Sequence, residues 1–140
     1  MDAAALSDRV IYFPARPDLA AAIDAWRTWL TTERRASRHT ADAYARDFAA
    51  FLTFLTEHIG EEPSLKNLGE LEASDFRSYL AHRSNEGLSR ASMARAMSTL
   101  RNAFKFLDRA GQVHNPAIRT IKTPRLPKSV PKALAADDAL

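Results

Sequence analysis

Cysteine is absent from the 140-residue chain, and glycine is scarce, with four residues. Without cysteine the protein can form no disulfide, no thiolate metal site and no cysteine nucleophile. The four histidines lie on separate segments without metal-ligand spacing, and the sequence has no glycine-rich phosphate loop, no HExxH and no GxSxG motif. We therefore expect no metal, no cofactor and no catalytic residue in this chain, and a reducing cytoplasm as its location.

Long apolar runs are missing as well. No segment approaches the ~18 apolar residues that a membrane helix requires, and residues 1–16 lack the basic start and apolar centre of a signal peptide. Apolar residues make up 46% of the chain and charged residues 26%, which is typical of a globular protein. At this length we expect a single domain with tails and no membrane segment.

Acidic residues are unevenly distributed, so the net charge of +3 conceals two halves of opposite sign. Residues 1–76 carry eight Lys or Arg and thirteen Asp or Glu, whereas residues 77–132 carry twelve basic residues and only Glu86 and Asp108 as acids. Such a local cationic excess suits a polyanion such as nucleic acid. A solubility role would give the same count, so charge alone does not decide the function.

The periodicity of apolar residues predicts an all-α domain. Helix-forming patterns cover four segments, and the caps that we expect are Ser37, Ser74 and Ser89, with Gly60 ending the second helix. A loop is expected between Gly60 and Ala73. The predicted helices span residues 17–33, 37–60, 74–87 and 89–110, within a domain of residues 17–122 that follows a flexible tail, 1–16. Residues 123–140 are predicted to be a proline-rich basic linker and the start of a further domain.

The predicted helix over residues 89–110 has two distinct faces. Its apolar stripe consists of Met93, Met97, Leu100, Phe104 and Leu107. The opposite face is polar and cationic and carries no acid, whereas a solvated helix normally mixes both signs to form ion pairs. Arg95 and Lys105 lie on this polar face, so we expect their replacement by alanine to weaken DNA binding without unfolding the domain.

Cations also surround the two serine caps, although a helix N-terminus is stabilised by acids rather than bases. Exposed backbone N–H groups and the helix dipole favour phosphate there, and a helix of this width fits the major groove of DNA. Each residue alone could equally be an ordinary surface residue, but the face as a whole favours binding. The candidate DNA-binding residues are Arg38, His39, Thr40, Arg46, Arg90, Ser92, Arg95, Thr99, Asn102, Lys105, Lys122, Arg125 and Lys128.

Several spaced residues together resemble a known family. The first group is Ser37-Arg-His-Thr40, Tyr44, Asp47 and Phe51, and the second is Ser92, Arg95, Ser98, Leu100-Arg101 and Phe104, followed by Asn115-Pro116. This composite resembles the N-terminal core-binding domain of Xer-type tyrosine recombinases, and the XerC branch is favoured. The likeness covers about residues 19–131.

The resemblance implies a four-helix SAM-like bundle that forms half of a clamp on duplex DNA, with the second and fourth helices over the major groove. It also implies that the catalytic residues lie in a further, C-terminal domain, so that Tyr12, Tyr44 and Tyr79 are not the nucleophile and this chain alone is not an enzyme. The complete protein would act with a second recombinase subunit, without metal or nucleotide cofactor, in DNA integration or in resolving chromosome dimers at segregation.

Two other functions stay open at this point. A regulator of helix-turn-helix type would also be basic and helical, although the second helix is long and no tight three-helix unit is evident. A helical adaptor could use the basic face to bind an acidic protein. Binding to duplex DNA and its dependence on salt distinguish these functions.

Overall fold

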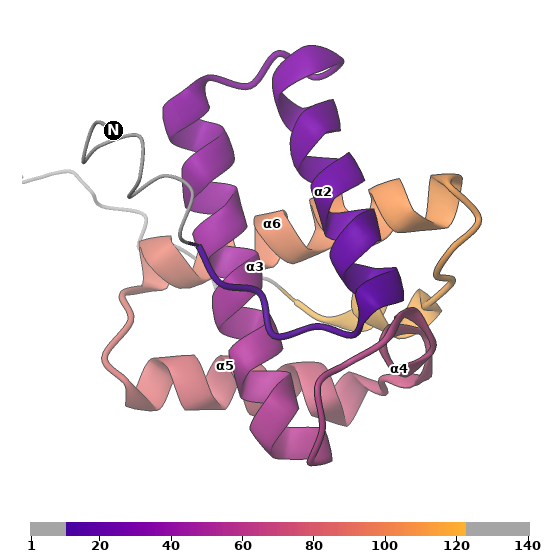
Figure 1. The fold of residues 1–140 in the computed structure, drawn as a ribbon. Helices are drawn as coiled ribbons and strands as arrows, with labels where there is room; N and C mark the ends of the chain where they lie inside the picture. The colour runs from indigo at the N-terminus through magenta and orange to yellow at the C-terminus, as the bar shows by residue number, and fades with distance from the viewer. Residues whose placement is uncertain (1–10, 123–140) are drawn as a thin grey trace, which may run out of the picture.

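The computed structural model of the chain describes residues 11–122, and these residues are entirely helical, without a strand. The all-α prediction is confirmed, and the predicted helices 17–33, 37–60 and 89–110 agree with the observed bounds to within a residue. The elements are α2 (Pro17–Thr32), α3 (Arg38–Ile59), α4 (Leu65–Glu70), α5 (Ala73–Asn85), α6 (Arg90–Arg109) and the 3₁₀-helix η1 (Pro116–Thr120) (Figure 1).

The two longest helices begin at the predicted serine caps. Ser37 precedes α3, and its Oγ accepts a hydrogen bond from the backbone N–H of Thr40 at 3.1 Å. Ser89 precedes α6, and its Oγ accepts a hydrogen bond from the backbone N–H of Ser92, also at 3.1 Å. Each bond satisfies one of the N–H groups that a helix start leaves without a partner. Gly60 ends α3 with a φ of 86°, a left-handed conformation that glycine adopts without strain.

The segment between α3 and α5 differs from the prediction in two places. It was expected to be a loop, but it contains α4, which is capped by Ser64 and buries only Leu68. A helix this short has too few turns to produce a periodic apolar stripe. The next helix, α5, is capped at Glu72 instead of Ser74, because the backbone N–H of Glu72 donates to Oδ2 of Asp75 at 2.7 Å.

The helices form two crossed sets. In Figure 1, α2 and α3 lie side by side and run in opposite directions, whereas α5 and α6 run across them. α6 passes behind α3 in this view and contacts both α2 and α3. Because α6 packs across both α2 and α3, its inward residues complete the core while its outward residues stay available for binding.

Phe51 of α3 lies at the centre of an aromatic cluster and is fully buried. Its ring centroid lies 5.9 Å from that of Phe48, 6.0 Å from Phe76, 5.1 Å from Tyr79 and 6.2 Å from Phe104. Edge-to-face and offset ring pairs at these distances add to the free energy gained by burying apolar area. The cluster joins α3, α5 and α6 and so fixes the frame in which the polar face of α6 is presented.

Residues 11–16, predicted as part of the tail, pack against the domain. The backbone N–H of Arg16 donates to the carbonyl oxygen of Pro63 at 2.9 Å, and the hydroxyl of Tyr12 donates to Glu62 at 2.9 Å. Phe13 packs against the core with the guanidinium of Arg27 over its ring. These residues therefore belong to the folded domain; residues 1–10 and the predicted linker, 123–140, lie outside the described part.

No helix within residues 11–122 has the length and apolar character that would let it cross a lipid bilayer.

Replacing Phe51 with alanine should lower the free energy of unfolding by about 3–5 kcal/mol, because it removes a buried ring and leaves a cavity among four other aromatic side chains. Urea denaturation followed by circular dichroism measures this change. Thr53→Ala, an exposed position on the same helix, is the control and should stay within about 0.5 kcal/mol of wild type. Equal stability of the two variants would contradict this account of the core.

Candidate nucleic-acid interface

The outward face of α6 combines small and cationic side chains. Ala91, Ser98, Lys105 and Arg109 are exposed, and the side chain of Arg95 is 50% exposed. From Arg90 to Leu107 the helix contains no acidic residue, and the first acid is Asp108. The predicted cationic face is therefore present on the folded domain, with small side chains between its arginines and lysine.

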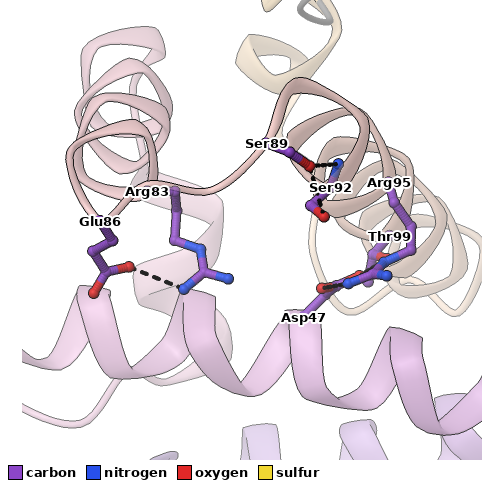
Figure 2. A network of polar contacts seen from close by, with 7 residues as sticks. All are labelled: Asp47, Arg83, Glu86, Ser89, Ser92, Arg95 and Thr99. Carbon is purple, nitrogen blue, oxygen red and sulfur yellow. Dashed lines mark hydrogen bonds and ion pairs between the residues drawn. The ribbon is translucent and has the colours of Figure 1, made fainter.

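A buried carboxylate from the neighbouring helix holds Arg95. Asp47 of α3 is only 4% exposed, and it accepts hydrogen bonds from Nε and Nη2 of Arg95, both at 2.9 Å (Figure 2). The hydroxyl of Thr99, one turn further along α6, donates to Oδ2 of the same carboxylate at 3.0 Å. A buried carboxylate is tolerated when cationic and hydroxyl donors satisfy it in this way.

Thr99 was predicted to contact DNA, and this prediction is wrong. Its side chain is fully buried and its hydroxyl bonds to Asp47. Asn102 also turns toward the protein, because its Oδ1 accepts a hydrogen bond from Nε1 of Trp26 in α2 at 2.8 Å. Helical spacing places both residues beside the polar face, but α2 and α3 cover the two edges of that face.

Two groups around Asp47 have shifted pKa values. The hydrogen bonds that Arg95 donates to the Asp47 carboxylate raise the pKa of Arg95 above its usual range, so the guanidinium stays charged. Burial raises the pKa of Tyr79 in α5 to about 12, which keeps its hydroxyl protonated at neutral pH. Its ring packs against Phe51 in the aromatic cluster.

The first turn of α3 places Arg38, His39 and Thr40 on the surface, and Arg46 is exposed two turns later, directly before Asp47 in the chain. At the start of α6, Arg90 is exposed and Ser92 is half-buried, with its Oγ 3.1 Å from that of Ser89. The bond between Asp47 and Arg95 brings these two helices together. Lys122 is exposed at the end of the described residues, while Arg125 and Lys128 lie outside them.

A hollow of about 490 Å³ at the end of α6 contains cations that the prediction left out. Arg101, Lys105, Arg109 and Arg119 line it over Phe104 and Ile118. Lys105 was among the predicted residues, and the helical spacing of Arg101 and Arg109 around it could have added these two to the candidates. Nothing in the sequence identifies Arg119, which η1 brings to the hollow and which pairs with Asp108 at 3.5 Å.

Metal-ligating side chains do not gather within residues 11–122, where no group of three His, Asp or Glu residues could hold an ion. The three histidine–carboxylate pairs found there lie apart from one another. They join His58 to Asp75, His82 to Glu86 and His114 to Asp108.

The fold and this face define a small helical domain with one cationic side, and comparison with known proteins places it in a family. Residues 23–111 match the phage integrase N-terminal SAM-like domain. The chain belongs to this family.

Relatives that are similar over about nine tenths of this chain carry the name tyrosine recombinase XerC. The protein of Rhodospirillum centenum is 43% identical over 127 residues, that of Brucella suis 46% over 126 and that of Mesorhizobium japonicum 41% over 126. These matches cover 91%, 90% and 90% of this chain but 37%, 40% and 40% of the relatives. The chain thus spans about two fifths of their length. No solved structure matches the chain.

Arg95 and Lys105 should differ in their effect on stability, which corrects the expectation that neither supports the fold. Arg95→Ala leaves the buried carboxylate of Asp47 without its charged partner and should lower the free energy of unfolding by about 1–3 kcal/mol. Lys105→Ala removes an exposed side chain and should change it by less than about 0.5 kcal/mol. Chemical denaturation of both variants tests this, and an unaltered Arg95→Ala midpoint would contradict a structural role for the pair.

Proposed function

We propose that this domain binds duplex DNA as one part of a site-specific tyrosine recombinase. The observation that carries the proposal is the outward face of α6, where Arg95, Lys105 and Arg109 stand on a helix whose first acid is Asp108. Membership in the phage integrase N-terminal SAM-like family supports it, as does the recombinase name of the relatives.

The shape of the α6 face suits a close approach to DNA. Its exposed Ala91 and Ser98 project little beyond the backbone, and the longer cationic side chains flank them. A phosphate backbone can therefore reach the helix while Lys105 and Arg109 neutralise charges on either side. We infer that the exposed Arg38, at the start of α3, adds a phosphate contact from a second helix.

The relatives' names and lengths support a wider proposal for the complete protein. We infer that a further domain supplies the catalytic residues, that two recombinase subunits act together on one recombination site, and that strand exchange in the cytoplasm needs no metal or nucleotide cofactor. Resolution of chromosome dimers at segregation is the cellular role that this proposal favours, because the XerC name recurs among the relatives.

Fluorescence anisotropy of the 140-residue chain with a short labelled duplex tests DNA binding. A clamp half held mainly by phosphate contacts should bind weakly, and its affinity should fall steeply between about 50 and 200 mM salt. A regulator of helix-turn-helix type would instead prefer one operator sequence strongly over a scrambled duplex. Failure to bind any duplex at low salt would overturn the proposal and favour an adaptor for an acidic protein.

Lys105→Ala should weaken binding and reduce the slope of log affinity against log salt by about 0.9, the loss of one phosphate contact. The matched control is Lys66→Ala, which removes the same charge from α4, where the side chain of Lys66 is 84% exposed and its Nζ lies 3.8 Å from Glu70. The control should retain the wild-type slope. Identical losses in the two variants would show that net charge, and not the α6 face, governs binding.

A further inference from the structure

Arg95 is held by one edge of its guanidinium while another edge stays accessible. A guanidinium offers two forks of paired N–H donors, one formed by Nε with a terminal nitrogen and one formed by the two terminal nitrogens. Asp47 takes the first fork, because its oxygens bond to Nε and Nη2, each at 2.9 Å. The side chain of Arg95 is nevertheless 50% exposed. The second fork, Nη1 with Nη2, therefore remains available to a ligand.

Asp47 is itself fixed, so it sets the direction in which Arg95 points. The carboxylate is 4% exposed and cannot rotate freely, since Thr99 donates to Oδ2 at 3.0 Å from the same helix that carries Arg95. Figure 2 shows the three side chains converging between α3 and α6. An unrestrained arginine must lose considerable side-chain entropy when it binds, and the pair with Asp47 removes much of that loss in advance.

We propose that Asp47 is a positioning residue for DNA binding, which presents the free fork of Arg95 to a pair of acceptor atoms on DNA. This inference rests on the proposed function. The acceptors that fit such a fork are two phosphate oxygens or the O6 and N7 atoms of a guanine. Asp47 does not touch DNA and acts only through Arg95.

The sign of the effect separates this role from simple electrostatics. Replacing Asp47 with asparagine removes a negative charge near a polyanion, so electrostatics alone predicts tighter binding. If Asp47 positions Arg95, the same substitution weakens binding, because an amide offers only one acceptor and cannot hold both donors of the fork. The two explanations thus predict changes in opposite directions from a single substitution.

The first experiment compares Asp47→Asn with Glu57→Gln in the 140-residue chain, by anisotropy with one labelled duplex at low salt. Both variants raise the net charge by one, and Glu57 is exposed on the same helix. Glu57→Gln should bind as tightly as wild type or more tightly, whereas Asp47→Asn should bind about fivefold more weakly or worse. Asp47→Asn that binds like Glu57→Gln overturns the inference.

A double-mutant cycle distinguishes positioning from a general structural role. In an Arg95→Gln background the fork is gone, so adding Asp47→Asn should weaken binding no further. An equal loss in both backgrounds would show that Asp47 only supports the fold and would overturn the inference. All variants are compared below their melting temperatures.

If Asp47→Asn does not fold, Thr99→Val is the alternative variant, because it keeps the carboxylate and removes one of its donors. Thr99→Val should also weaken binding to the duplex, and unchanged binding would overturn the inference.

The same data identify the acceptor pair. Loss of a phosphate contact in Arg95→Gln should lower the salt slope by about 0.9 and affect all duplexes alike, whereas loss of a guanine contact should leave the slope and reduce preference among duplex sequences. These outcomes differ from a failure of the proposed function, in which the wild-type chain itself would bind no duplex. Binding by wild type with unaltered binding by Asp47→Asn rejects the positioning role alone.

Discussion

The buried carboxylate of Asp47 is the constraint on which the geometry of this domain depends. Burying a charge costs several kcal/mol unless donors replace the lost water. Here all the bonds that the structure gives the Asp47 carboxylate come from α6, through Arg95 and Thr99. The two helices can therefore neither slide nor rotate against each other without exposing or breaking that pair. The polar contact therefore adds a directional constraint to the apolar packing between α3 and α6.

α6 performs three tasks with different sides of one helix. Its apolar side, with Met97 and Phe104, closes the core. Its two edges make polar bonds to the neighbours, to Asp47 of α3 through Thr99 and to Trp26 of α2 through Asn102. Only the remaining outward side is free for a ligand. The usable binding face is consequently narrower than the polar face of the helix taken alone.

The separate roles of the apolar side, the two edges and the outward side of α6 explain which predictions could be made from the sequence. Caps and periodicity are local properties, so Ser37, Ser89 and the bounds of the long helices follow from the residues themselves. Thr99 failed as a surface prediction because its burial depends on where α3 lies, which the period of α6 does not contain. Asn102 is half-buried for the same kind of reason, since α2 brings Trp26 to its Oδ1. The motif that carried the family resemblance included both Asp47 and Arg95, yet a motif does not reveal that the two side chains bond to each other.

Stability explains only some of the cations on α6. Arg95 has a partner in Asp47, but Lys105 and Arg109 border a hollow that also holds Arg119 and contains Asp108 as its acidic member. Like charges gathered at the end of a helix repel one another unless a polyanion approaches. Arg101 has an additional structural task, since its Nη2 donates to the carbonyl oxygen of Ile121 at 2.6 Å and ties α6 to the segment after η1. The proposed DNA-binding helix is thus joined by a hydrogen bond to the last described residues of the chain.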